Sequence, residues 1–218
     1  MITNLLSWTQ YLPALFSGVG VALALTGIVI VLGFFLGLLL AYGSVSKVRL
    51  VKAVALVVVE VGRGAPLLVL LYIVYQGLPQ FQLTPTAFAS AVIAFTWSAG
   101  AYSAEVIRTS IDAVPNGQSE AAIVVGMNRV DSFRFIIAPQ AIRVGIPPLM
   151  NIAIQFFQFT SLAYAITVPE IMQAAYFQAT VTFDYFSVFL AAAFLYASIT
   201  IPTTMLVSRL ERHLAKHL

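Results

Sequence analysis

The residues best suited to chemistry are charged side chains that stand inside apolar segments. Glu60 and Arg63 are three residues apart, and Glu105 and Arg108 repeat that spacing. Residues three apart share a helix face, so each acid can pair with its base. Because an ionised group at the bilayer centre costs on the order of 2.5 to 3.5 kcal/mol on insertion scales, such pairs should face protein or water. We interpret Glu60 with Arg63 as a structural pair before Pro66 or, alternatively, as part of a substrate path. Glu105 with Arg108 is interpreted as a gating or structural pair.

Patterns typical of enzymes and metal sites are weak in this chain. His213 and His217 have a metal-compatible spacing but no third ligand arranged with them, so we interpret them as part of a solvated helix end. The absence of cysteine excludes disulfides, cysteine-ligated metal sites and thiol nucleophiles. No Gly-Lys pair occurs, which excludes a phosphate-binding loop for ATP. We therefore expect a non-enzymatic chain with no catalytic residue, no metal and no cofactor of its own.

The elements that must position these residues are membrane helices. Of the 218 residues, 61% are hydrophobic and 9% are charged, and the mean hydropathy is +0.96, whereas soluble proteins carry about 25% charged residues. A bilayer core of about 30 Å needs about 20 apolar residues per helix. These lengths predict an all-α integral membrane protein with five spans, near residues 15–42, 53–76, 86–108, 133–159 and 186–207.

Lys and Arg residues orient these spans, because cytoplasmic loops retain positive charge. Ten of the eleven follow the first span, flank the loop between the third and fourth spans, or lie in the C-terminal tail, and Arg63 is the exception. We therefore expect the N-terminus outside the cell and the C-terminus in the cytoplasm. The basic pI of about 9.3 then reflects topology and predicts no nucleic acid partner.

The topology divides the chain into three regions. Residues 1–14 contain Trp8 and Tyr11 and should lie at the membrane interface before the first span. Residues 15–208 form the transmembrane domain, and residues 209–218 form a cytoplasmic tail.

Small residues and loop residues support three further predictions. Gly33 and Gly37 form a small-residue pattern that lets two helices approach closely and weakly indicates a dimer contact. On the outer side, residues 169–180 are long enough for a short helix. Asp184 is placed to cap the last span.

A short charged helix is predicted in the loop between the third and fourth spans. Asn116 and Ser119 are plausible N-caps, Glu120 would occupy the first turn, and Gly126 can adopt a left-handed C-cap. Its apolar side would consist of Ala121, Ala122, Val124 and Val125. A helix this short is marginal alone in water, so it must dock on something. It either packs on its own bundle or is presented to a separate cytoplasmic protein.

Residues 120–139 resemble the EAA loop of type I ABC importer permeases. That pattern is E-A-A, three residues, G, nine residues and I-x-L-P, and Ala138 replaces its leucine in this chain. The positions that match are Glu120, Ala121, Ala122, Gly126, Ile136 and Pro139. Residues 63–79, 101–118 and 140–151 resemble segments of the polar amino acid permeases, the branch that includes histidine, arginine and glutamine importers.

The resemblance implies a type I ABC importer permease fold and a coupling role for the loop at about 112–132. Its helix would seat in a groove of an ATP-binding cassette ATPase dimer, which would hold ATP and Mg. The coupling residues would be Ser119, Glu120, Ala121, Ala122, Gly126 and Pro139. Further implied partners are a second permease copy or a paralogous permease, an extracytoplasmic solute-binding protein and the lipid bilayer. The implied location is the plasma (inner) membrane of a prokaryote.

The function implied is that of a permease subunit that moves polar amino acids by alternating access. An amino acid needs donors for its carboxylate and acceptors for its ammonium, and Asn151, Gln155 and Gln158 follow one helix face at suitable spacings. The substrate-path candidates are Glu60, Arg63, Ser98, Tyr102, Asn151, Gln155, Gln158, Thr160 and Ser161. Relatives often read K-D-T-S-L where residues 158–162 read QFTSL, which argues against a cationic side chain being bound by this chain itself. The alternatives are an ion-coupled carrier or channel and, less favoured, a membrane-embedded enzyme.

Overall fold

The computed structural model describes residues 7–215, and all the regular elements within that range are helices. A 3-10 turn, η1 (Ser7–Tyr11), leads into the first long helix. The α-helices are α1 (Leu12–Ser44), α2 (Arg49–Gly64), α3 (Leu67–Tyr72), α4 (Ala87–Asp112), α5 (Asn116–Val124), α6 (Arg129–Ser132), α7 (Ala138–Phe159), α8 (Ile171–Thr182) and α9 (Tyr185–Ala215). Shorter π and 3-10 turns connect them: η2 (Ile73–Gly77), η3 (Leu78–Phe81), η4 (Phe133–Ile137) and η5 (Thr160–Ile166).

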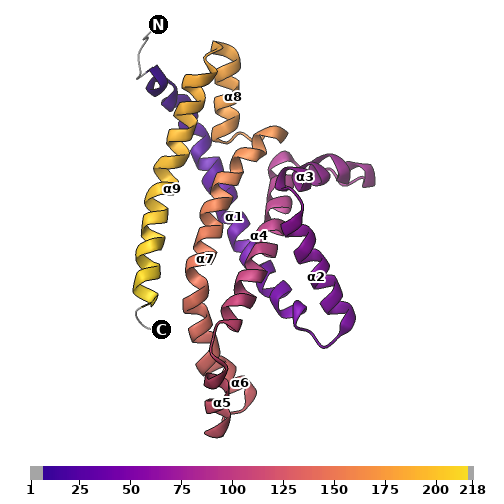
Figure 1. Cartoon of the computed structure of the whole chain (residues 1–218). Coiled ribbons are helices and arrows are strands. Elements are labelled where there is room, and N and C mark those ends of the chain that lie inside the picture. Colours follow the sequence, from indigo (N-terminus) through magenta and orange to yellow (C-terminus); the bar gives the residue numbers. More distant parts are fainter. Residues whose placement is uncertain (1–6, 216–218) are drawn as a thin grey trace.

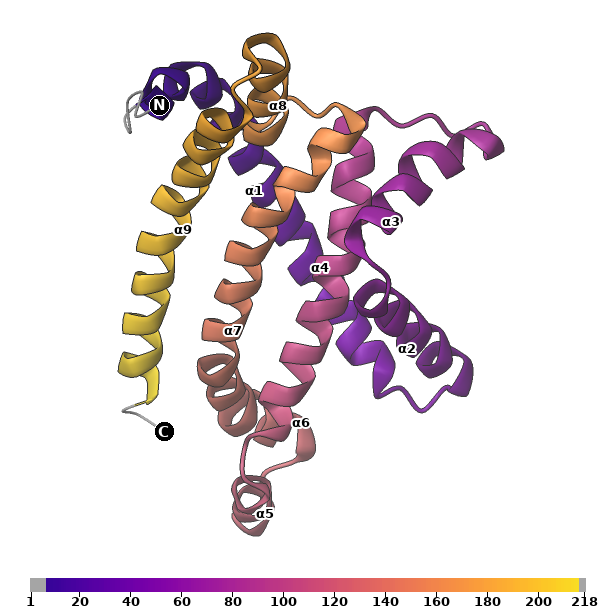
Figure 2. The same cartoon turned by 45° about the horizontal axis from the view of Figure 1, so that its top comes forward.

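The helices surround α1 and α4, which pack against each other along much of their length (Figure 1). α2 packs on α1 and α4, α7 packs on α4, and α9 packs on α7. Figure 2 shows α8 at the end of the molecule that holds the N-terminus, and α5 with α6 at the opposite end. The connection between α1 and α2 and the C-terminal end of α9 also lie towards the α5 end (Figure 1). The segments rich in Lys and Arg are therefore gathered at one end of the fold.

Within residues 7–215, three helical stretches are long and apolar enough to cross a membrane: Ser7–Ser44, Arg129–Ile166 and Tyr185–Leu214. The pair Arg49–Gly64 and Leu67–Phe81 passes the same test together, but it bends by 110°. α4 covers the predicted third span, and buried serines such as Ser98 and Ser103 make it less apolar. Length and apolarity thus confirm three of the five predicted crossings, or four if the bent pair is one span.

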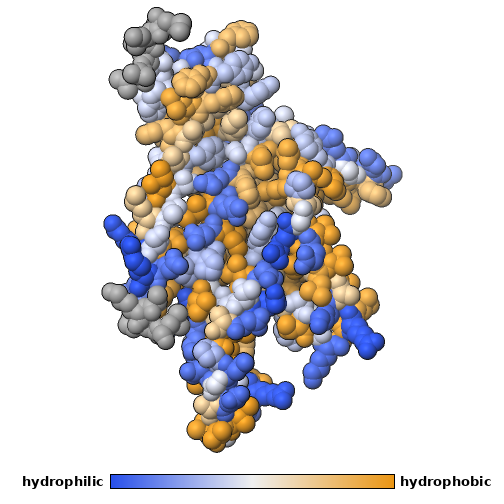
Figure 3. Space-filling model, viewed as in Figure 1, coloured by the Kyte–Doolittle hydropathy of each residue, from blue (hydrophilic) through white to orange (hydrophobic). Residues whose placement is uncertain are grey.

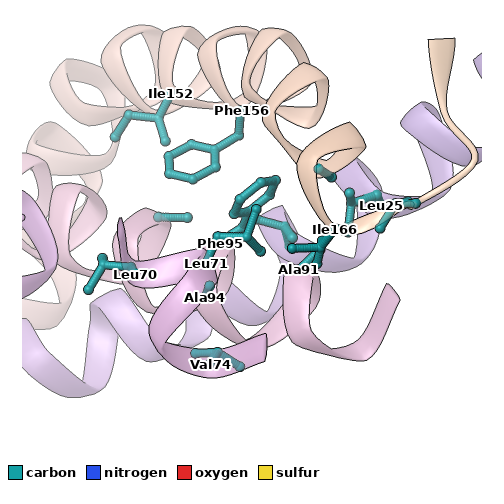
Figure 4. Close-up of a cluster of buried hydrophobic side chains, with 14 residues drawn as sticks. Leu25, Leu70, Leu71, Val74, Ala91, Ala94, Phe95, Ile152, Phe156 and Ile166 are labelled. Atoms are coloured by element: carbon teal, nitrogen blue, oxygen red, sulfur yellow. The ribbon is translucent and has the colours of Figure 1, made fainter. Parts of the chain in front are cut away.

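The largest core cluster joins α1, α3, α4 and α7 through Leu25, Leu71, Phe95, Phe156 and neighbouring side chains. Figure 4 shows the rings of Phe95 and Phe156 turned towards each other, and their centroids are 6.4 Å apart in an edge-on arrangement. Lipid tails are as apolar as these side chains, so close packing rather than exclusion of water holds such helices together.

The pattern at Gly33 and Gly37 brings α1 close to α4 of the same chain. A Cβ atom on Gly33 would stand 2.7 Å from the Cβ of Ala99, and one on Gly37 would stand 2.7 Å from the Cβ of Ser103. Real Cβ atoms essentially never come so close. The prediction of a close helix contact is confirmed, but the contact lies within one chain and does not mark a dimer.

Candidate functional site

The α5 helix begins differently from the prediction. Pro115 is its N-cap residue, Asn116 is already helical, and no side chain caps the end. The hydroxyl of Ser119 donates to the Asn116 carbonyl at 3.1 Å inside the helix. The two predicted N-caps are therefore wrong, because the restricted backbone of Pro115 directs the chain into the helix one residue earlier. As a result Glu120 lies beyond the first turn of α5. Its predicted place within that turn is therefore wrong.

The other end of α5 follows the prediction closely. Gly126 has a φ angle of +83°, which is the left-handed conformation expected of a C-cap glycine. The amide of Met127 donates to the Ala122 carbonyl and that of Gly126 donates to the Ile123 carbonyl, both at 3.0 Å. These two bonds form the Schellman motif, which satisfies carbonyls that a helix end otherwise leaves unpaired. The helix therefore ends at a fixed point before the chain turns into α6.

α5 is exposed on most of its surface. Its contacts are mainly with α6 and η4, and Ala122 is its one buried residue, with 4% of its surface accessible. Val124 and Val125 are 86% and 76% exposed, and Figure 3 shows apolar surface at this tip of the molecule. Of the two predicted arrangements, packing on the long helices of its own bundle is therefore not what the structure has.

α5 is joined by a short turn to α6, which is the start of a long membrane helix. Asn128 caps α6 by accepting from the amides of Val130 and Asp131 at 3.0 and 2.9 Å. From there the chain is helical without a break over Arg129–Ile166, through the π turn η4 into α7. Pro139 is the second residue of α7, which directly follows the π turn η4. A displacement of α5 and α6 must therefore move the start of α7.

Arg63 pairs with a different acid from the one predicted. Its Nη1 lies 3.6 Å from Oε2 of Glu105 on α4, and its guanidinium lies 6.0 Å from the ring centre of Tyr102. The ion pairs described for residues 7–215 do not include Glu60, whose side chain is exposed. The predicted Glu60–Arg63 pair is therefore wrong, because the neighbouring helix α4 offers Arg63 a carboxylate and an aromatic face.

The predicted pair of Glu105 and Arg108 is confirmed. Arg108 Nη2 lies 2.6 Å from Glu105 Oε1, and its Nη1 lies 3.4 Å from Asp112 Oδ2. Together with Arg63, these residues form a row of alternating charge that runs along α4 to its last residue. Their side chains are between 29% and 65% exposed, so each pair contributes about 0 to 1 kcal/mol.

Ser98 and Tyr102 bind the end of α2, where the chain bends. The Gly62 carbonyl would normally accept from the amide four residues later, but that residue is Pro66 and has no N–H. The Ser98 hydroxyl donates to this carbonyl instead, at 2.9 Å. Tyr102 donates to the Arg63 carbonyl at 3.3 Å. These two substrate-path candidates thus support the bend, and the Arg63 Nε beside them is buried without a partner.

The three substrate-path candidates on α7 form an exposed polar face. Asn151, Gln155 and Gln158 are exposed, whereas Phe156 and Phe157 are buried on the other side of the helix. Figure 3 shows hydrophilic residues over the middle of α7. A polar face at membrane depth requires water or protein beside it rather than lipid.

The last two candidates on this segment lie in the turn after α7. Thr160 is buried and donates to the Phe157 carbonyl at 2.7 Å. Ser161 donates to the Gln158 carbonyl at 2.7 Å. Both hydroxyls therefore help to hold the transition from α7 to η5.

Glu170 is a structural residue that the sequence pattern did not single out. It is fully buried, and its carboxylate accepts from the amides of Met172 and Gln173 at 2.8 Å and from the Tyr196 hydroxyl at 2.5 Å. Burial raises the pKa of Glu170 above its ordinary value, and these hydrogen bonds partly oppose the shift. The available signal was an acid just after Pro169 and before an apolar helix, which is an N-cap position.

Two predicted features of the outer end, a short helix and a cap on the last span, are present in the structure. The short helix expected at residues 169–180 is confirmed as α8. Asp184 caps α9, because its Oδ1 accepts from the Ser187 amide at 3.3 Å, and Tyr11 donates to its Oδ2 at 3.1 Å.

Residues 7–215 contain no cluster of three or more side chains able to hold a metal ion, and His217 lies outside that range.

Comparisons with known proteins agree on one family. Residues 30–216 match the family described as "Binding-protein-dependent transport system inner membrane component". The chain is 38% identical to the L-cystine transport system permease protein TcyB of Bacillus subtilis (strain 168), over 95% of this chain and 89% of that one. It is 31% identical to the probable glutamine ABC transporter permease protein GlnP of the same strain, over 93% and 94% of the two chains.

A solved structure resembles the whole chain. The crystal structure of an amino acid ABC transporter with histidines superposes with a TM-score of 0.92 and 35% sequence identity, and the match covers 98% of this chain and 100% of that one. The MetNI methionine ABC transporter in an inward-facing conformation has a TM-score of 0.75 at 17% identity, which is a likeness of fold.

Proposed function

Because the chain belongs to the family of binding-protein-dependent transport system inner membrane components, we infer that it is the permease subunit of an ATP-driven importer of amino acids. The family match covers most of the chain, and the relatives match nearly end to end. An ion-coupled carrier, a channel or a membrane enzyme is not favoured by these relatives. The fold is that of a type I ABC permease.

The observation that carries the proposal is the combination of exposure and continuity at α5. Val124 and Val125 are apolar and exposed, yet they lie at the end of the molecule that is rich in Lys and Arg and should face water. A partner that covers them gains the free energy of burying apolar surface. α6 follows α5 after a short turn and is continuous with η4 and α7, so a partner that holds α5 also gains a mechanical connection into the membrane.

We propose that this partner is an ATP-binding cassette ATPase dimer, which holds ATP and Mg. The coupling residues would be Ser119, Glu120, Ala121, Ala122, Gly126 and Pro139. Ala122 and Gly126 set the position and the end of the helix, whereas Glu120 and Ala121 are exposed and available for contact. Pro139 lies where the helical path enters α7.

The topology proposed for this function has five crossings. The bent pair of α2 and α3 would cross once, and α4 would cross with its small polar residues turned towards α1 and α2. This places the N-terminus and α8 outside and α5 in the cytoplasm, as positive charge at the α5 end favours. Residues 1–14 would lie at the interface, 15–208 in the transmembrane domain and 209–218 in a cytoplasmic tail of a prokaryotic inner membrane protein.

A second permease copy, or a paralogous permease, would complete the path. The exposed face of Asn151, Gln155 and Gln158 cannot face lipid favourably, so it should face the partner subunit or water. The amide groups supply both donors and acceptors, as the carboxylate and ammonium of a polar amino acid require. Arg63 and Glu60 would lie along the same path, while Ser98, Tyr102, Thr160 and Ser161 would support its walls.

The mechanism proposed is alternating access. ATP binding closes the ATPase dimer, the α5 helices move with it, and the starts of the two α7 helices are displaced. The path then opens outward to accept an amino acid from an extracytoplasmic solute-binding protein docked at the α8 end. Hydrolysis of ATP resets the path to the inward-open state.

Reconstitution of the chain in liposomes with its ATPase and binding protein tests the function directly. We expect uptake of one or more of the twenty amino acids that requires ATP and stops when the ATPase or the binding protein is left out. Uptake that follows an ion gradient in the absence of ATP would contradict the proposal.

A further inference from the structure

The helical path from α6 to α7 contains a wide turn. η4 (Phe133–Ile137) is a π turn, and the amide of Ala138 donates to the carbonyl of Phe133, five residues back. An α-helix makes this bond to the residue four back, so the turn holds one residue more than a regular helix needs. Turns of this kind are rare, bend helices and are frequent at functional sites.

A proline follows the wide turn closely. Pro139 is the second residue after η4 and has no N–H, so it cannot donate an α-helical bond to the carbonyl of Phe135. The π turn η2 likewise ends two residues before a proline, Pro79. The path from α6 to α7 therefore lacks a backbone donor directly after its widest turn.

Proline alone does not widen a helix in this chain. Pro147 and Pro148 lie inside α7, and Pro202 lies inside α9, within regular α-helix. Packing sets η4 apart, because it contains no buried residue, whereas Pro147 is buried. The elements that η4 packs against are α5, α6 and α7, its neighbours along the chain. Few side chains from other parts of the fold therefore hold this turn in its present shape.

Two cavities adjoin η4. Phe133 and Ala138 line an apolar cavity of about 410 Å³, together with Ile111 near the end of α4. Ile137 lines a second cavity of about 230 Å³, together with Asp112 and the start of α5. Close-packed interiors resist a change of shape. The turn can change its shape here without displacing a packed core.

One polar group beside the turn is unsatisfied in this arrangement. The hydroxyl of Ser132, the residue directly before η4, is buried and has no hydrogen-bond partner. A buried polar group without a partner costs free energy. That cost raises the free energy of the present shape of the turn, and so lowers the cost of leaving it.

We propose that η4 is a hinge in the path between α5 and the membrane. When α5 and α6 are displaced, the angle between α6 and α7 changes at this turn, and the path does not tilt as one rigid rod. The inference rests on the importer function proposed above. It adds the place at which the moving path bends.

The rival place for a bend is the pair Pro147 and Pro148, in the middle of α7. Next to it, Gly145 lies so close to α4 that an added Cβ would stand 2.9 Å from the Ser110 hydroxyl oxygen. A bend here would have to open this close contact between two helices. At η4 no such contact has to be opened, which favours η4 as the hinge.

Amide hydrogen exchange in the complex with the ATPase tests the hinge without any variant. Exchange is measured in the nucleotide-free complex and in the complex that holds a non-hydrolysable ATP analogue. We expect exchange over residues 133–138 to change several-fold between the two states, because a turn that bends breaks and reforms its hydrogen bonds. Exchange over residues 145–155 should stay the same. Equal exchange over residues 133–138 in the two states, or a change confined to residues 145–155, would overturn the inference.

Pro139→Ala tests the hinge by function, because it restores the missing N–H and lets the turn close as an α-helix. Alanine favours a helix far more than proline does, so the unfolding midpoint in detergent should stay equal or rise. The number of amino acid molecules imported per ATP hydrolysed should nevertheless fall at least about fivefold, the lower end of coupling between sites. Co-purification with the ATPase should be unchanged.

Pro148→Ala makes the same change inside α7, outside η4, and should leave the import ratio unchanged. An unchanged ratio for Pro139→Ala, or an equal fall in both variants, would overturn the inference. Loss of the ATPase from Pro139→Ala would overturn it too, since Pro139 would then act by contact with that partner. Absence of ATP-driven uptake in the wild type would count against the importer function, and the exchange measurement, which needs no transport, would still decide whether η4 bends.

Discussion

Two short helices lie at opposite ends of the molecule, α5 and α8, and they are held in opposite ways (Figure 2). α8 is part of the bundle: Ile171, Ala175 and Ala179 are fully buried against α1 and α9. α5 buries only Ala122 and exposes an apolar tip. The contrast teaches that a helix of this length is fixed either by its own fold or by another protein, and that only the second kind can pass movement between chains.

The largest effect is expected when Glu170, the buried N-cap of α8, is removed. Glu170→Ala would leave the Tyr196 hydroxyl and two amides of α8 without their acceptor. The lost cap and the unpaired buried groups should together destabilise the protein by about 2 to 4 kcal/mol. The midpoint of thermal unfolding in detergent should fall clearly for Glu170→Ala and much less for Glu170→Gln, which keeps an acceptor. Equal midpoints for all three proteins would show that α8 is not held in this way.

At α5 we expect the reverse, a loss of partner binding without a loss of stability. Glu120→Arg places a positive charge on an exposed helix face and should weaken association with the ATPase at least about tenfold, or 1.4 kcal/mol. Its unfolding midpoint should equal that of the wild type, because Glu120 has no partner among the described ion pairs. Glu211→Arg, a matched charge reversal on α9, should leave co-purification of the ATPase unchanged. Normal co-purification with Glu120→Arg would remove the distinction between the two helices.

A smaller effect is expected where α5 ends. Gly126→Ala would force a Cβ-bearing residue into the left-handed region, at about 1 to 2 kcal/mol. No atom lies within 4 Å of the added Cβ, so the backbone angle alone is responsible. Amide hydrogen exchange over α5 should become several-fold faster. Gly117→Ala, at an equally open helical position, should leave exchange unchanged or slow it. Equal exchange in the two variants would mean that the Schellman motif does not fix the helix end.

The smallest effect concerns pH at the outer end. Burial raises the pKa of Glu170 above 4.5, so the folded protein holds this proton more tightly than the unfolded chain does. The stabilisation that the folded state gains by binding this proton more tightly is fully present below pH 4.5. It is lost as the pH rises through the folded-state pKa of Glu170. The unfolding midpoint of the wild type should therefore decline relative to that of Glu170→Gln over this window. Parallel pH profiles of the two proteins would show that Glu170 does not titrate on unfolding.

The same contrast explains which features could be predicted from the sequence. The end of α5 depends on Gly126 and its local bonds, and the cap of α9 depends on Asp184, so local rules were sufficient for both. The start of α5 was placed wrongly because Pro115 was not weighed against the side-chain caps Asn116 and Ser119.

Features that depend on a neighbouring helix were not accessible in this way. A spacing of three residues offers Arg63 only the acids of its own helix, whereas packing of α2 on α4 supplies Glu105. Glu170 has an ordinary capping position in the sequence, and its importance comes from Tyr196, which is 26 residues away. The roles of Ser98 and Tyr102 at the bend depend likewise on which carbonyls α2 leaves open.

Cysteine labelling tests the central claim that α5 is held by another protein. The chain has no cysteine of its own, so Val124→Cys on α5 and Phe183→Cys at the outer end each give a single labelling site, at positions that are 86% and 80% exposed. We measure the rate of maleimide labelling at each site in the solubilised permease alone and with the ATPase bound. Labelling at position 124 should slow at least about tenfold when the ATPase binds, while labelling at position 183 stays the same. Equal labelling rates at position 124 with and without the ATPase would contradict the account.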